Sequence, residues 1–253
     1  MTSTKQPEWF RLGDSLMWPL VGMAAVTCRS RKLSSVDLSA LGELAVCHHA
    51  GCLEASAHIN KRGKHSTAVC LIRQSVEALC VAEASLQEKE LAEPLLQAWK
   101  EGTKSHGEVR KALERDAWPR YGRGLWEESW SDFYANLARA VQPYAHYTPE
   151  LQGWQFAMVS YSGGTSFVAA TGLETYDPLK ATRVTLLHML LTWMLGRLLL
   201  ANSPSADAES KRADILQLGK ALAASKLLFH SGDWGSQLAP SMLFKPGHSW
   251  VDD

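Results

Sequence analysis

Two pairs of polar residues in this sequence have the types and the spacing that chemistry would need. The first pair is Arg73 and Glu77, the only charged residues in the apolar stretch from 66 to 82. Four residues apart on a helix, their side chains share one face and can pair. Burying an ion costs several kcal/mol, so a pair inside a bundle needs further hydrogen bonds. The pair therefore indicates either a structural salt bridge between helices or a polar site within the bundle.

The second pair is Arg139 and His146, in the segment RAVQPYAHYTPEL. Pro143 and Pro149 disfavour a continuing helix, and each biases the residue before it away from the helical conformation. The sequence therefore predicts that a helix ends here and that His146 lies on a bent segment. A histidine that titrates near neutral pH suits proton transfer, and an arginine suits a phosphate.

If these residues formed a ribonuclease site, its chemistry would be metal-independent. In that reaction a base removes the proton of a ribose 2′-hydroxyl, which then attacks the adjacent phosphate while a cation stabilises the developing charge. His146 would be the base, and Arg139 or Arg73 would be the cation.

A weak motif supports the same chemistry. Arg-x(4–6)-His is the pattern of the HEPN superfamily of helical RNA-cleaving and RNA-binding domains, and this chain has it at Arg139–His146 and at Arg183–His188. Two matches are about what chance supplies in this composition. The order of segments adds to the motif, because LIRQSVEAL, then QPYAHYTPEL, then a hairpin signal resembles HEPN-like bacterial helical proteins of unknown function. The resemblance covers residues 40–200.

This resemblance implies that Arg73, Glu77 and His146 face one another, with Tyr144 nearby. It also implies RNA as a partner, a homodimer that builds the site, and a role in a bacterial defence or toxin–antitoxin system. The chain departs from the HEPN nuclease pattern at Ala140, where a polar residue commonly follows the arginine, and in having a proline inside the spacer.

Two other classes of function fit the same residues. One is a non-catalytic helical subunit of a multiprotein complex, in which the arginine, glutamate and histidine form an internal polar network. The 10 tryptophans favour it, because tryptophan is enriched at protein interfaces. The other is a small-molecule site within the bundle, lined by the same polar residues. Four tryptophans near the chain ends are expected either to anchor a partner or to cap the core: Trp9, Trp18, Trp234 and Trp250.

The sequence gives no support for metal or nucleotide binding. His48 and Cys52 share a helix face, but Cys47 and His49 turn away from it, so at most two ligands converge. His48 is expected to be a core histidine. The chain contains no phosphate-binding loop, dinucleotide-binding glycine turn, zinc-ligand pairs or nucleophile elbow. We therefore expect neither a metal nor another cofactor.

Composition favours a folded cytoplasmic protein. The 253 residues are 46% hydrophobic and 21% charged, and 26 basic residues balance 26 acidic ones, so no global field attracts nucleic acid or membrane. Five cysteines and an N-terminus without a secretory pattern indicate reduced thiols. Residues 184–201 are long enough to span a bilayer, but they contain His188 and Arg197, and we expect a buried core helix instead of a membrane span.

Helical periodicity predicts an all-α bundle in a single domain over residues 1–253, with its core at about 35–230. Irregular segments are expected at 1–13 and 231–253, and a broken helix at 14–30 because of Pro19 and Gly22. Ser-Gly-Gly among β-forming residues predicts a small hairpin within 154–170. Further helices are expected at 36–60, 66–90, 93–102 and 103–116, from about 125 to the segment RAVQPYAHYTPEL, and at 178–202 and 206–230.

The long helix at 36–60 is expected to begin at Ser35, which suits an N-cap, and to end before the glycine of KRGK. Its buried face is predicted from the spacing of Leu41, Leu44 and His48, which continues through Cys52.

Overall fold

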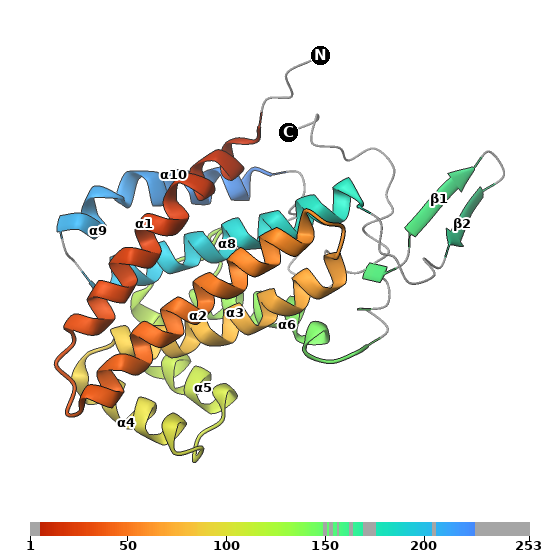
Figure 1. Cartoon of the computed structure of the whole chain (residues 1–253). Helices are drawn as coiled ribbons and strands as arrows, with labels where there is room; N and C mark the ends of the chain where they lie inside the picture. Colours follow the sequence, from red (N-terminus) through yellow and green to blue (C-terminus); the bar gives the residue numbers. More distant parts are fainter. Residues whose placement is uncertain are drawn as a thin grey trace.

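The computed structural model describes residues 6–148, 151, 154–155, 157–161, 164–168, 176–203 and 206–225. In that part of the chain the protein is an all-α bundle, as predicted (Figure 1). The helices are α1 (Glu8–Ser30), α2 (Val36–Asn60), α3 (His65–Leu86), α4 (Lys89–Lys100), α5 (His106–Asp116), α6 (Trp130–Val141), α8 (Pro178–Asn202), α9 (Ala206–Ser210) and α10 (Arg212–Ala223), with short 3-10 helices η1 (Trp118–Arg120) and η2 (Gln142–Ala145).

Two short strands lie in the segment for which a hairpin was predicted. They are β1 (Ala157–Tyr161) and β2 (Gly164–Val168), which pair antiparallel with Tyr161 opposite Gly164. The predicted irregular segment at 231–253 lies outside the described residues.

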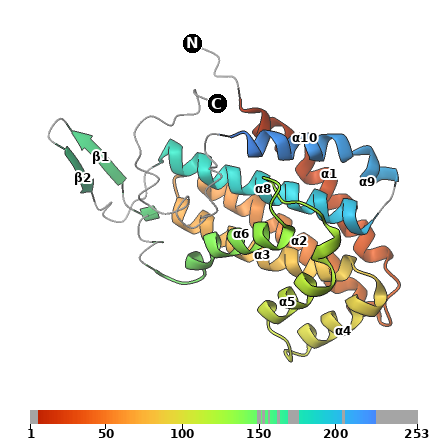
Figure 2. The same cartoon turned by 180° about the vertical axis from the view of Figure 1, so that it is seen from behind.

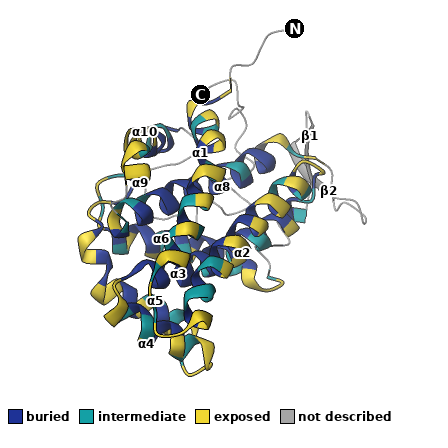
Figure 3. Ribbon diagram, turned by 60° about the vertical axis from the view of Figure 1, so that its left-hand side comes forward, coloured by how far each residue is buried: buried dark blue, intermediate teal, exposed yellow. Residues whose placement is uncertain are grey.

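Helix α3 is the centre of the bundle. It contacts α2, α8, α4, α5 and α6, and Figures 1 and 2 show it with α2 on one side and with α6 and α8 on the other. Every residue from Ala78 to Leu86 is buried. By contrast, Figure 3 shows exposed residues on the outer faces of α4 and α5. A helix that is apolar on all faces must be enclosed, which is why the other helices surround this one.

Helix α1 corrects two expectations. It begins at Glu8, so residues 8–13 are helical and not irregular, and it continues without a break to Ser30 through Pro19. Proline removes one backbone hydrogen bond, but its fixed φ angle is compatible with a helix. The buried residues of α1 fall on one face against α2, α8 and α10, and this burial outweighs the local loss: Trp9, Gly13, Leu16, Leu20, Ala24 and Cys28.

Helix α2 begins and ends where the sequence predicts, but its predicted face is wrong. The Ser35 side chain accepts a hydrogen bond from the Leu38 backbone N–H, and Gly63 follows the helix with φ of 79°. Leu44 and His48 are exposed, and Leu44 is 62% exposed. Of the predicted residues only Cys52 is buried, and the buried face is made of Leu38, Gly42, Ala45, Val46, His49, Ala50, Cys52, Leu53, Ser56 and Asn60. Small residues there let α3 approach closely, which apolar spacing alone did not reveal.

The closest approach is at Gly42. A Cβ atom at this position would lie 2.0 Å from Ser85 Oγ of α3 and 3.2 Å from the Cβ of Cys28 in α1. Ser85 Oγ and Cys28 Sγ are themselves 3.0 Å apart. Three helices therefore meet at a point where there is room for a hydrogen atom and no more.

Helix α8 is the described helix that is long and apolar enough to cross a membrane. That segment runs from Lys180 to Asn202, and 78% of its apolar window is buried inside the protein. The burial agrees with the predicted core helix, while the cytoplasmic location stays a prediction.

Three histidines are buried in the bundle and are hydrogen-bonded. His49 Nδ1 is 2.7 Å from Ser75 Oγ, and His188 Nε2 is 2.8 Å from Ser56 Oγ. His65 Nδ1 is 2.7 Å from the side-chain oxygen of Asn60, and its Nε2 accepts from a backbone N–H. Burial lowers the pKa of each of the three histidines from 6.5 to about 4.

We predict that Gly42→Ala lowers the free energy of unfolding by about 1–3 kcal/mol, because the new methyl group overlaps Ser85. Gly51→Ala, in the same helix, is the matched control, since nothing lies within 4 Å of its added Cβ. It should be neutral or stabilise by up to about 1 kcal/mol through helix propensity. Urea denaturation measures both, and equal effects of the two substitutions would contradict the close approach.

We also predict that stability rises with pH between about 4 and 6.5. In that range the unfolded chain protonates its histidines while buried His49, His65 and His188 stay neutral, so the unfolded state binds more protons. Buried Glu83 has the opposite effect on stability, because its pKa is raised to about 7 and the folded state therefore binds the extra proton. It is one such group against three histidines. Thermal unfolding midpoints measured from pH 4 to 7 test the direction, and a midpoint higher at pH 5 than at pH 7 would contradict it.

Candidate functional site

Arg73 and Glu77 form the predicted ion pair, at the edge of the bundle. Arg73 Nη2 lies 2.6 Å from Glu77 Oε1, and the two side chains are 14% and 42% exposed. Arg73 also donates a hydrogen bond of 3.3 Å to Gln142 Oε1 and so connects α3 to η2. The pair is thus less buried than the apolar sequence around it suggests, because this face of α3 borders a hollow.

The other predicted site residues lie elsewhere. As expected, α6 ends at Val141 and the chain continues as η2, after which His146 is exposed on extended backbone with φ of −136°. Arg139 is exposed and donates to Asn136 at 3.4 Å. Tyr144 is buried against Trp154, with ring centroids 6.0 Å apart. Neither His146, Arg139 nor Tyr144 is among the residues that line the hollow beside Arg73 and Glu77.

The histidine that the structure places beside this pair is His106. It is the first residue of α5, and the preceding Ser105 caps this helix through a reciprocal capping box with Glu108. We call the hollow here the α3–α5 cleft, with a volume of about 280 Å³. It is lined by Arg73, Val76, Glu77, Ser105, His106, Gly107, Arg110, Tyr134, Ala138 and Gln142.

Four of the residues that line the cleft each have a buried polar atom without a hydrogen-bond partner. They are Arg73 Nε, His106 Nε2, Arg110 Nε and the Tyr134 hydroxyl oxygen. The Tyr134 side chain is 2% exposed, and its hydroxyl lies beside the Cys80 thiol. A buried polar group without a partner costs about 1–3 kcal/mol, and folded proteins contain few of them. Four around one small hollow therefore indicate a place for a polar ligand.

The charge around the cleft favours an anion. Arg73 and Arg110 oppose the single carboxylate of Glu77, so the lining has one excess positive charge when His106 is neutral. Burial lowers the pKa of His106 below 6.5, Glu77 raises it, and the two arginines lower it further. His106 and Gly107, in the first turn of α5, also line the cleft, where a helix end has a partial positive charge.

A second hollow adjoins the cleft. We call it the apolar groove; it lies between α2, α3 and α4 and has a volume of about 540 Å³. Glu77 and His106 belong to both linings, so the two hollows meet at these residues. The groove is lined by Leu41, Leu44, Ala45, His48, Gln74, Glu77, Ala78, Val81, Trp99 and His106.

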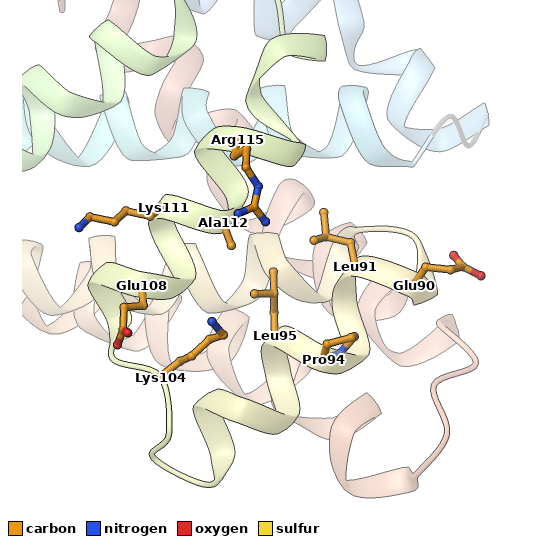
Figure 4. A pocket seen from close by; sticks show the side chains of 9 residues that line it. All are labelled: Glu90, Leu91, Pro94, Leu95, Lys104, Glu108, Lys111, Ala112 and Arg115. Carbon is orange, nitrogen blue, oxygen red and sulfur yellow. The ribbon is translucent and has the colours of Figure 1, made fainter.

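A third hollow, between α4 and α5, is a weaker candidate. Figure 4 shows Leu91, Leu95 and Ala112 facing the gap, with Lys111 and Glu90 pointing away on opposite sides. Its volume is about 410 Å³. None of its lining residues has a buried polar atom without a partner among those described, so nothing there requires a ligand.

Glu83 is a buried carboxylate that the sequence patterns did not indicate. It lies one residue beyond the apolar stretch 66–82. Glu83 is 1% exposed, and its Oε1 accepts a hydrogen bond of 2.8 Å from Trp118 Nε1. Tyr121 also lies beside it, and the Tyr121 hydroxyl accepts from Gln87 and Asn202 at 2.8 and 2.9 Å. This network joins α3, η1 and α8. A charge within the continued apolar run to Leu86 was the signal that could have found it.

Metal binding finds no geometric support in the described residues. No group of three or more His, Cys, Asp or Glu side chains there is placed to hold an ion. His48 Nε2 and Cys52 Sγ are 3.6 Å apart, as the helix spacing predicts, but His48 is exposed and is not the core histidine that was expected. Its neighbour His49 takes that position.

We predict that Glu83→Gln becomes more stable relative to wild type as pH rises from about 5 to 7. Burial raises the pKa of Glu83 to about 7, so the folded state keeps a proton that the unfolded chain releases at lower pH. The free energy of unfolding of the wild-type protein falls by up to about 1.4 kcal/mol per pH unit because of this group. Glutamine does not titrate and so has no such effect. Urea titrations of both proteins across this range measure the difference, and a difference that does not change with pH would contradict the buried carboxyl.

The geometry is the only guide to function that this chain offers. Comparison with protein-family models, with curated proteins and with solved structures finds no match.

Proposed function

We propose that the protein binds a ligand through an anionic group, a phosphate or a carboxylate, held in the α3–α5 cleft. The observation that carries this proposal is the set of four buried polar atoms without partners on Arg73, His106, Arg110 and Tyr134. An anion would accept hydrogen bonds from the two guanidinium groups and from the tyrosine hydroxyl, and so would satisfy most of the set at once.

Glu77 positions the guanidinium group of Arg73 in this arrangement. Its carboxylate pairs with Arg73 at 2.6 Å, which holds that guanidinium in place and leaves its Nε free. The Glu77 carboxylate and backbone also lie beside the His106 ring, and both raise the pKa of His106. His106 Nε2 is a further donor to an anion when the ring is protonated. Binding of an anion therefore favours the protonated form of His106.

An RNA phosphate is one source of such an anion, and the HEPN-like resemblance makes RNA the macromolecule to test. In that case His106, and not His146, is the histidine beside the arginines. A small molecule with a phosphate or carboxylate is the other source, in line with a ligand site within the bundle. The two share their head-group chemistry and differ in salt dependence, because RNA binding through several phosphates weakens steeply with salt.

We predict that Arg110→Gln weakens binding of the anion by about tenfold to a hundredfold, the loss of one charged hydrogen bond. The binding constants of inorganic phosphate, acetate and a short single-stranded oligoribonucleotide are measured by calorimetry in EDTA, at low and moderate salt. RNA integrity is followed on a gel in the same samples, which tests cleavage directly.

Arg115→Gln is the matched control, because it makes the same change on the same helix at a residue outside the cleft that pairs with Asp116. His146→Ala is a second control, since His146 does not line the cleft. Both variants should bind as wild type does. Absence of binding for all three probes, or equal losses in Arg110→Gln and Arg115→Gln, would overturn the proposal.

A further inference from the structure

We infer that the ligand is a small amphiphile, with one anionic head in the α3–α5 cleft and an uncharged apolar body in the apolar groove. This inference rests on the proposed function, because it assigns the anionic head to the same cleft. It adds the chemical class of the rest of the ligand.

The two hollows adjoin at two residues. Glu77 and His106 belong to the linings of both, and we infer that a ligand whose head lies near Arg110 extends past them into the groove. The groove, at about 540 Å³, falls within the range of roughly 300–1,000 Å³ that is typical of small-molecule sites. The cleft, at about 280 Å³, is the smaller of the two hollows and lies just below this range.

The walls of the groove are those of an apolar site. Leucine, alanine, valine and tryptophan side chains from three helices face it, and Leu44 is 62% exposed there. Trp99 of α4 lies partly buried against the core and offers an aromatic wall. The polar members of the lining are few and lie among these apolar residues: His48, Gln74, Glu77 and His106.

The distribution of charge selects a ligand with one anionic end. All the arginines that line the two hollows belong to the cleft, and the groove contains a carboxylate, Glu77, but no lysine or arginine. A second negative charge on the ligand would therefore lie in the groove near Glu77 without a cation to pair with. The same argument disfavours a polyanion such as RNA, because successive phosphates need successive cations.

The test uses linear carboxylates as probes, titrated calorimetrically into the full-length protein: acetate, butanoate, hexanoate and octanoate. Affinity should increase with chain length by about two- to fourfold per methylene group, as expected when apolar surface is buried. Octanedioate, which adds a second carboxylate, and 1-octanol, which lacks the charge, should each bind at least about tenfold more weakly than octanoate.

Leu44→Ser tests the groove without disturbing the core, because Leu44 is exposed. It should reduce the affinity for octanoate severalfold and leave that for acetate unchanged. Leu216→Ser is the matched control, because Leu216 is an exposed leucine on α10, 44% exposed, that lines neither hollow. Ala78→Phe, which fills the groove from α3, should abolish the dependence on chain length.

The outcomes separate this inference from the proposed function. Equal affinities for acetate and octanoate, or equal effects of Leu44→Ser and Leu216→Ser, would overturn the amphiphile and leave the anion site standing. Binding of single-stranded RNA without binding of octanoate would also overturn it. If no anion of any kind binds, the proposed function itself fails.

Discussion

Enclosure of α3 is the constraint on which the rest of this structure depends. This helix is apolar on nearly all faces, so no single partner can bury it, and six other α-helices contact it. Burial of apolar side chains contributes roughly 25 cal/mol per Å² of surface removed from water, which makes this enclosure the main driving force for the bundle. Each polar group on α3 must then find a partner on the helix that covers it.

These polar groups match the helices to one another. Ser75 pairs with His49 of α2, Ser85 contacts Cys28 of α1, and Glu83 accepts from Trp118 of η1. A helix that slid or rotated against α3 would leave a buried polar atom without a partner, at a cost of about 1–3 kcal/mol each. Apolar burial thus holds the bundle together, and the hydrogen bonds select one arrangement of it.

The candidate site arises where this enclosure is incomplete. At the face beside Arg73 and Glu77, α5 begins and α6 ends without closing over α3, and the polar atoms left between them lack partners. The apolar groove, between α2, α3 and α4, adjoins the cleft at Glu77 and His106. A binding site at this point fits the gathering of four such atoms on residues that line one hollow, because unsatisfied groups persist where something else can satisfy them.

The sequence by itself determined what depends on neighbours along the chain. The helical class, the Ser35 cap, the end of α6 before Pro143 and the Arg73–Glu77 pair were all predictable, since caps, proline effects and i,i+4 contacts act within a few residues. Only the tertiary structure decided which face of α2 is buried, that α1 continues through Pro19, and that His106 and not His146 lies beside Glu77. Those outcomes depend on how closely separate helices approach, and the spacing of residues within one helix contains no measure of that distance.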